Sequence, residues 1–219
     1  MSGSDSHRSD SYRTVAAAVE AELEVKRSRF LCRLVPVADE AQARAEVDAV
    51  RRQHWDARHH CSAFVLGPAG AIERSSDDGE PSGTAGAPML EVLRGSGLTE
   101  VVAVVTRWFG GTLLGTGGLV RAYGDAVRAA VDRARVREVR LLHEIGVVVD
   151  PAIAGRVEAE LRNRDHAVLD TEWGLATESG PSVRITVAVA PADRAGLEAD
   201  LAELTSGTAR CQDGATRWA

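Results

Sequence analysis

The segment from Arg107 to Gly118 carries the densest group of residues with recognisable chemistry. It reads RWFGGTLLGTGG, so a cation and two aromatic side chains precede five glycines. Free backbone N–H groups in such a loop, and the positive end of a following helix, favour an anion. We expect Arg107 to bind phosphate and Trp108 to stack on a base, the alternative being that Trp108 or Phe109 lies in the core. The glycines that would let a backbone approach are Gly110, Gly111, Gly117 and Gly118.

Two nucleotide-binding motifs fit this glycine-rich segment only in part. Gly110 and Gly115 have P-loop spacing, but Thr116 stands where the phosphate-binding lysine belongs. Gly115 and Gly117 begin a dinucleotide fingerprint, yet Val120 replaces its third glycine. The sequence therefore gives weak support to a nucleotide-binding enzyme, and the glycines can equally serve tight turns and close packing of a helix on a strand.

A second polar segment, SSDDGEPSGTAGAP at residues 75–88, is too rich in glycine and proline to be regular structure. Its carboxylates suit a divalent cation or acid–base chemistry, so a hydrolase that uses the cleft beside the glycine-rich segment is one alternative. The spacing is not that of an EF-hand, and we favour a structural role, in which these side chains cap turns and Ser82 or Thr84 caps a short helix. The carboxylates concerned are those of Asp77, Asp78 and Glu80.

His59, His60 and Cys61 form a third group of chemically competent side chains. No CxxC or HExxH pattern accompanies them, so a polar entry to a strand is a better interpretation than a zinc site or a Cys–His nucleophile. We expect no metal site and no cofactor.

The chain has 219 residues and a formal net charge of −6, which by itself does not indicate a nucleic-acid binder. The charge is unevenly distributed, because residues 101–140 carry seven basic and three acidic side chains, whereas residues 141–219 carry seven basic and thirteen acidic ones. A local basic segment decides whether phosphate is attracted. We therefore add Arg121 and Arg128, on a predicted amphipathic helix over 119–134, to the expected nucleic-acid contacts.

The sequence predicts a soluble, cytoplasmic protein. No apolar run approaches the roughly 20 residues that span a bilayer, and residues 1–13 lack the apolar core of a signal peptide. The three cysteines, Cys32, Cys61 and Cys211, are an odd number at wide spacing, which favours a reducing compartment over a disulfide framework.

The elements that must position these loops are strands and helices of an α+β protein. Asp39 and Gln42 form a capping-box pattern at a helix start, and the run VVAVV at 101–105 has no polar face, which is typical of a buried strand. The other elements expected in the first part of the chain are a bent strand or hairpin over 23–37, a strand over 61–66 and a short helix over 89–94 closed by Gly95.

The pattern changes after about residue 135, where we expect a second domain. Strands over 139–149, 168–173, 183–189 and 208–213, with helices from Pro151 and after Pro191, give the order βαββαβ, which is that of the ferredoxin-like fold. The expected division is a disordered tail over 1–18, a first domain over 19–135 and the ferredoxin-like domain over 136–219.

Taken together, the acidic and glycine-rich loops resemble the IMPACT/YigZ family, in its bacterial two-domain form. The resemblance rests on SDDGEPSGTAGAP at 76–88, VVTRWFGG at 104–111 and LGTGGLVRAY at 114–123, with RHHCSA at 58–63 and KRSRF at 26–30. The acidic family-motif loop, whose role the resemblance does not specify, comprises Asp77, Asp78, Gly79, Glu80, Pro81, Gly83 and Thr84.

The resemblance implies a first domain with the fold shared by ribosomal proteins and domain IV of elongation factor G, and a second like that factor's C-terminal domain. Eukaryotic relatives regulate translation by competing for the activator of a starvation-sensing kinase. They also carry an extra N-terminal interaction domain, which we expect this chain to lack because only about 20 residues precede the first expected strand. We expect a non-catalytic, translation-associated regulator that binds RNA or the ribosome. The alternatives are the hydrolase above and a protein-binding regulator that uses the acidic C-terminal domain.

Overall fold

The computed structural model describes residues 10–177 and 180–219 and divides the chain after residue 138 into two units. Within the described residues the protein is α+β, with five α-helices and two antiparallel sheets, as the sequence predicts at this level. No helix in the described part of the chain is long and apolar enough to cross a membrane.

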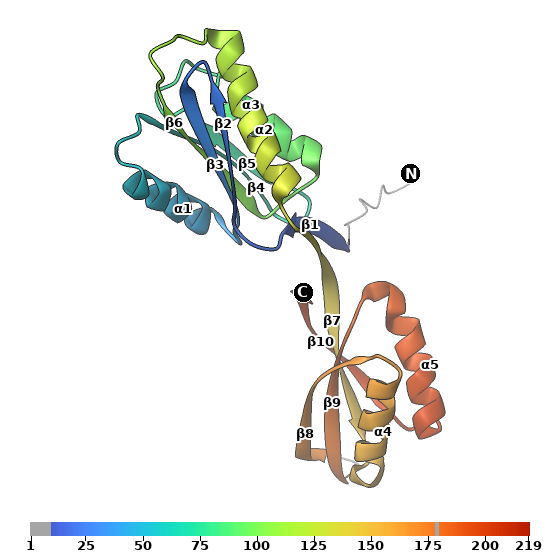
Figure 1. The fold of residues 1–219 in the computed structure, drawn as a ribbon. Coiled ribbons are helices and arrows are strands. Elements are labelled where there is room, and N and C mark those ends of the chain that lie inside the picture. The colour runs from blue at the N-terminus through green and yellow to red at the C-terminus, as the bar shows by residue number, and fades with distance from the viewer. Residues whose placement is uncertain (1–9, 178–179) are drawn as a thin grey trace, which may run out of the picture. The chain divides into compact units, whose positions relative to one another are not determined.

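The first unit is built on a five-stranded sheet in the order β2-β3-β6-β4-β5 (Figure 1). The expected hairpin is present as β2 and β3, and the VVAVV run forms the centre of β6, the middle strand. The strands are β2 (Val19–Val25), β3 (Ser28–Pro36), β4 (His59–Leu66), β5 (Ile72–Ser76) and β6 (Val101–Trp108).

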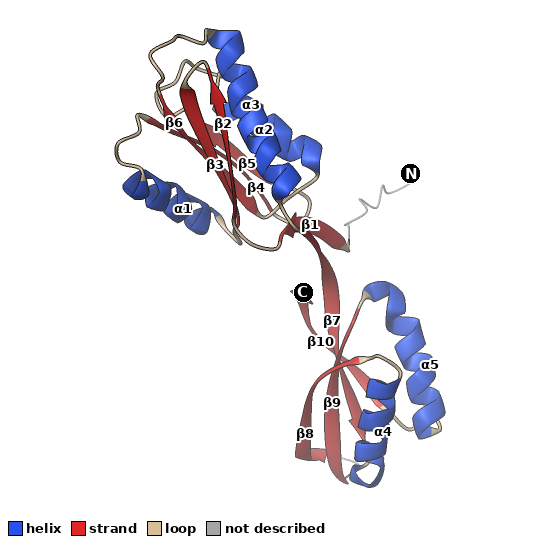
Figure 2. Ribbon diagram, viewed as in Figure 1, coloured by secondary structure: helices blue, strands red, loops and turns tan. Residues whose placement is uncertain are grey.

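Helices cover both faces of this sheet (Figure 2): α2 (Gly86–Ser96) and α3 (Thr116–Arg133) lie on one face and α1 (Glu40–Gln53) on the other. Alternate residues of β6 therefore enter different cores. Val101, Ala103 and Val105 pack with residues of α2 and α3, whereas Val102 and Val104 pack with residues of α1. Burial on both faces is why this strand has no polar side.

The start of α1 follows the sequence. The carboxylate of Asp39 accepts a hydrogen bond from the amide of Gln42 at 2.7 Å, and the Gln42 side chain accepts one from the amide of Ala38 at 3.0 Å. The end of α2 differs from the prediction, because the left-handed residue that closes the helix is Gly97 (φ 67°) and not Gly95. Helix α2 is therefore longer at both ends than the predicted 89–94.

The expected disordered tail is wrong for part of its length. Residues 1–9 lie outside the described residues, but Ser11–Val15 forms strand β1. Val15 is fully buried in the core of the first unit, the amide of Thr99 donates to the carbonyl of Arg13 at 2.9 Å, and that of Ala16 to the carbonyl of Arg135 at 2.8 Å. The partners of β1 are thus more than 80 residues away in sequence, which a local pattern does not reveal.

The second unit places its elements in the order strand, helix, strand, strand, helix, strand. Its sheet has the order β10-β7-β9-β8, and β1 also neighbours the long strand β7. Ile145, Val147 and Ile185 form its core with Leu161 of α4 and Leu201 of α5. The elements are β7 (Val136–Val149), α4 (Pro151–Asn163), β8 (Ala167–Thr177), β9 (Gly180–Val189), α5 (Arg194–Thr205) and β10 (Arg210–Trp218).

Candidate functional site

Four connections of the first unit meet where β6 ends, and we call this region the loop end. Arg29 pairs with Trp108 and His59 with Arg107 across the strands there. The four connections are the β2–β3 turn at 26–27, the α1–β4 connection at 54–58, the acidic loop at 77–85 and the glycine-rich loop at 109–115. Both loops singled out from the sequence therefore lie at the same end of one sheet.

Asp77 holds the acidic loop together and connects it to α2. Its carboxylate accepts hydrogen bonds from the amides of Gly83 at 2.8 Å, Ala85 at 3.0 Å and Gly86 at 2.8 Å, the last two at the start of the helix. Burial disfavours the charged carboxylate, but these three donors outweigh that effect and lower the pKa of Asp77. The sequence predicted this turn-capping role, whereas neither Ser82 nor Thr84 is the N-cap residue, which is Ala85.

Asp78 connects the acidic loop to β4 and α1. Its carboxylate accepts from the amide of His60 at 2.7 Å and from the guanidinium of Arg51 at 2.9 Å, and its carbonyl accepts from Nδ1 of His59 at 2.9 Å. His60 is buried and its Nε2 donates to the carbonyl of His54, and burial lowers its pKa. These histidines therefore fasten the loop to the strand instead of facing a ligand.

Glu80 forms a buried ion pair with Arg107, which overturns the expectation that Arg107 contacts phosphate. The guanidinium Nη1 lies 2.6 Å from Oε1 of Glu80, and the hydroxyl of Tyr123 donates to the same oxygen at 2.8 Å. Only 6% of Arg107 is exposed. Because strand residues alternate, Arg107 faces the α2–α3 core and Trp108 the opposite side.

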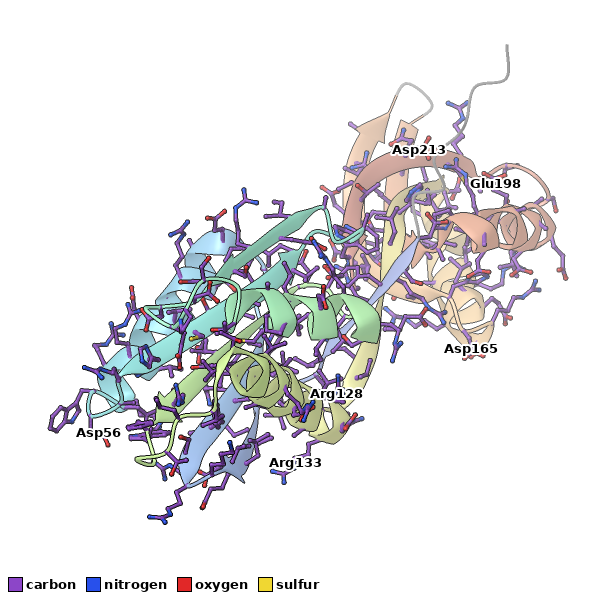
Figure 3. The ribbon with its side chains drawn as sticks, turned by 90° about the horizontal axis from the view of Figure 1, so that it is seen from above. Asp56, Arg128, Arg133, Asp165, Glu198 and Asp213 are labelled. Carbon is purple, nitrogen blue, oxygen red and sulfur yellow. The ribbon has the colours of Figure 1, made fainter. Side chains whose placement is uncertain are left out.

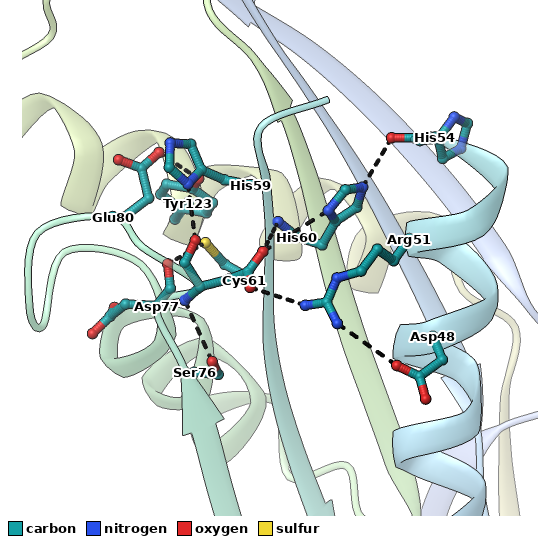
Figure 4. Close-up of polar contacts among 11 residues, drawn as sticks. Asp48, Arg51, His54, His59, His60, Cys61, Ser76, Asp77, Glu80 and Tyr123 are labelled. Carbon is teal, nitrogen blue, oxygen red and sulfur yellow. Dashed lines mark hydrogen bonds and ion pairs between the residues drawn. The ribbon is translucent and has the colours of Figure 1, made fainter. Parts of the chain in front are cut away.

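The thiol of Cys61 lies in the same interior region (Figure 4). It donates to the carbonyl of Asp77 at 3.0 Å, and Cys61 is fully buried. Burial raises the pKa of this thiol to about 12, so it stays protonated at neutral pH. The three carboxylates of the acidic loop and the thiol beside them are thus all engaged in internal hydrogen bonds, and no group of three or more His, Cys, Asp or Glu side chains in the described residues is placed to hold a metal ion.

Trp108 and Arg29 present a cation and an aromatic ring together at the loop end. The guanidinium carbon of Arg29 lies 3.8 Å from the centroid of the Trp108 ring, and the indole N–H donates to the carboxylate of Asp56 at 2.8 Å. Trp108 is half-buried, whereas Phe109 is 52% exposed. Neither aromatic belongs to the buried core.

The β2–β3 turn adds two cations in an unusual backbone conformation. Lys26 and Arg27 have φ values of 48° and 65°, the left-handed region that glycine or asparagine normally occupies in a two-residue hairpin. Each such residue costs about 1 kcal/mol or more. This segment contributes to the family resemblance, but no site was predicted here; the signal available in the sequence was that Lys26 is the chain's only lysine, beside two arginines.

The glycine-rich loop packs directly on this turn. A Cβ at Gly110 would lie 2.0 Å from the carbonyl carbon of Arg27, and the amide of Gly110 donates to the hydroxyl of Ser28 at 3.1 Å. The absence of a side chain at Gly110 therefore allows the glycine-rich loop to pack closely on the turn. At Gly111 and Gly117 an added Cβ would meet nothing within 4 Å, so their backbone is open to a ligand.

Arg121 and Arg128 lie elsewhere, on the outer side of α3. They line a groove of about 740 Å³ between α2 and α3. Arg128 forms an ion pair with Asp125 at 2.7 Å in the same helix. The structure thus separates the three arginines that the charge pattern of the sequence grouped, and Arg107 shares no exposed face with the other two.

The comparisons with known proteins give the family. Residues 26–131 match the Impact N-terminal domain, and residues 147–208 match a domain of unknown function, DUF1949. The chain is 38% identical to IMPACT family member YigZ of Escherichia coli, over 91% of this chain and 96% of that protein. The chain belongs to the IMPACT family.

Another relative gives the same family. The chain is 42% identical to IMPACT family member YvyE of Bacillus subtilis over 168 residues, 77% of each protein. A solved structure, described as that of a hypothetical protein, shares 38% identity and a TM-score of 0.64, over 94% of this chain and 98% of that one. The loops quoted for the resemblance all lie within the first matched domain, and the elements from β7 onward contain the second.

Proposed function

We propose that this IMPACT family protein is a non-catalytic, translation-associated regulator that binds RNA through the loop end of its first unit. The observation that carries the proposal is the Arg29–Trp108 pair beside the strained Lys26–Arg27 turn. Exposed cations contact phosphates, and an aromatic ring with a guanidinium above it offers a surface on which unpaired bases stack. Phe109 adds a second exposed ring to this surface.

The proposed contacts differ from those expected from the sequence. Arg107 supports the surface from inside, through its ion pair with Glu80, and Arg29 takes its place as the cation next to Trp108. Gly111 and Gly117 remain proposed points of close approach, whereas Gly110 has a structural role. The proposed RNA contacts are Lys26, Arg27, Arg29, Trp108 and Phe109.

The acidic loop supports a binding role over a hydrolytic one. The carboxylate of Asp77 accepts hydrogen bonds from three backbone amides. That of Asp78 accepts them from Arg51 and His60, and that of Glu80 from Arg107 and Tyr123. A general base needs a lone pair that faces the substrate, and the hydrogen bonds of these carboxylates point into the protein. We therefore propose that the loop is a scaffold for the loop end.

The architecture of both units is consistent with a relationship to translation proteins. The second unit has the element order of the ferredoxin-like fold, with β7 and β9 at the centre of its sheet. We propose this assignment, and for the first unit the fold of ribosomal proteins and elongation factor G domain IV. The cytoplasm, where ribosomes are, is the proposed location.

The experiment is an electrophoretic titration of the full chain with ribosomal RNA and with purified ribosomal subunits at two salt concentrations. We expect the triple variant Lys26→Ala, Arg27→Ala, Arg29→Ala to bind more weakly and with a smaller salt slope, by about 0.7 for each phosphate of single-stranded RNA that is no longer neutralised. The matched control removes three exposed arginines away from the loop end, Arg44, Arg74 and Arg94. Absence of binding by the natural chain, or equal weakening in both triple variants, would contradict the proposal.

A further inference from the structure

The outer side of α3 carries a charge pattern that neither the RNA proposal nor the fold requires. Arg121, Asp125, Arg128 and Asp132 alternate in sign along the helix and all line the groove between α2 and α3. On an ideal helix the four lie within an arc of roughly 60°. They therefore form one stripe, which we call the charged stripe.

An apolar strip runs beside the charged stripe, along the floor of the groove. Val120 and Val131 of α3 and Val92 of α2 all line the groove, and Val120 is 41% exposed. Gly124 of α3 is buried against α2, because an added Cβ there would lie 3.7 Å from Cγ2 of Val92. A half-exposed apolar strip with charged residues along its edge is typical of a surface that packs against a protein.

The charged stripe is complementary to itself when it is reversed. The midpoint between Arg121 and Asp132 falls between residues 126 and 127, and so does the midpoint between Asp125 and Arg128. A single two-fold axis at that point would therefore place each arginine against an aspartate of an antiparallel copy. In a parallel arrangement every residue would meet its own like charge, so the pattern disfavours that orientation.

We infer that this surface is a homodimer interface, in which α3 packs antiparallel on α3 of a second copy of this chain. Arg121 pairs with Asp132 of the partner subunit, and Asp125 and Arg128 form a four-residue network across the axis. Asp125 and Arg128 already form an ion pair at 2.7 Å within the helix, and the network would extend that pair across the axis. Arg128 is exposed, and Figure 3 shows its side chain on α3.

The test is sedimentation equilibrium of the full chain, from micromolar to millimolar concentration, with circular dichroism as a check on folding. We expect a concentration-dependent dimer for the natural chain. Arg121→Glu and Asp132→Arg each break both symmetry-related pairs and create like-charge contacts, so each should raise the dissociation constant by roughly tenfold or more. The double variant Arg121→Glu, Asp132→Arg swaps the charges and should restore the dimer.

The matched control is Arg133→Glu, which makes the same change of charge in the same helix at a residue that does not line the groove. It should leave the dissociation constant within about twofold of the natural value, because surface charge changes outside an interface have small effects. A natural chain that is monomeric at every concentration would overturn the inference. So would a dimer that withstands the single reversals, a double variant that stays monomeric, or a control that weakens the dimer as much as Arg121→Glu does.

Discussion

At the scale of single residues, the polar side chains of the loop end divide into those that build it and those that it presents. Arg107, Glu80 and Asp77 have partners inside the protein, whereas Lys26 and Arg29 remain exposed. A buried ion pair between Arg107 and Glu80 is strongly destabilising to break, because either partner alone would be an unpaired buried charge. The acidic residues that looked most like catalysts in the sequence therefore all have internal hydrogen-bond partners in this structure.

The cysteines give a prediction at this scale. Cys32 and Cys61 are fully buried, whereas Cys211 is exposed. Burial raises the pKa of all three thiols, to about 12 for Cys61. Because thiol reagents attack the accessible thiolate, we expect one rapidly labelled thiol in the native protein and three after denaturation. Mass spectrometry of the alkylated protein measures this. Rapid native labelling at Cys61 would show that its contact with the acidic loop opens readily.

At the scale of secondary-structure elements, the glycine-rich loop and the β2–β3 turn behave as one piece. Gly110→Ala places a methyl group against the backbone of Arg27 and should lower the free energy of unfolding by about 1–3 kcal/mol. Chemical denaturation measures this decrease. The control is Gly117→Ala, where the added methyl meets nothing within 4 Å and φ is not positive, and where we expect an increase of about 0.4–1 kcal/mol. Equal effects of the two variants would mean that the loop does not rest on the turn.

How far the sequence predicts these elements depends on how local the deciding contacts are. The cap of α1 at Asp39 and Gln42 and the buried run of β6 follow from neighbouring residues, and both were predicted. Strand β1 was not predicted. The hydrogen bonds of β1 and of the residue after it go to residues 98–100 and to Arg135, which lie far along the chain. The burial of Arg107 was missed for the same reason, since Glu80 and Tyr123 come from other elements.

At the scale of the whole molecule, each unit contains a hydrophobic core of its own. The core residues of the first unit and those of the second belong to separate clusters. Leu161 is fully buried in the second cluster and Leu93 in the first.

Separate cores predict separate thermal transitions. Leu161→Ala should destabilise the second unit by about 2–5 kcal/mol and leave the transition of the first unchanged, with Leu93→Ala giving the reverse result. Differential scanning calorimetry of the full chain, compared with the natural protein, measures both. If either variant shifted both transitions by the same amount, the two units would unfold as one cooperative body.

The close contact between Gly110 and the Lys26–Arg27 turn has a thermodynamic consequence for recognition. A flexible loop loses backbone conformational entropy when a ligand immobilises it, but here the backbone that carries the two cations is already fixed against a neighbouring loop. The spacing between the turn and the Trp108 ring is then set before a ligand arrives. A ligand binds such a surface with little rearrangement of the protein. The surface therefore selects partners in which the spacing between charge and ring matches that between the turn and the Trp108 ring.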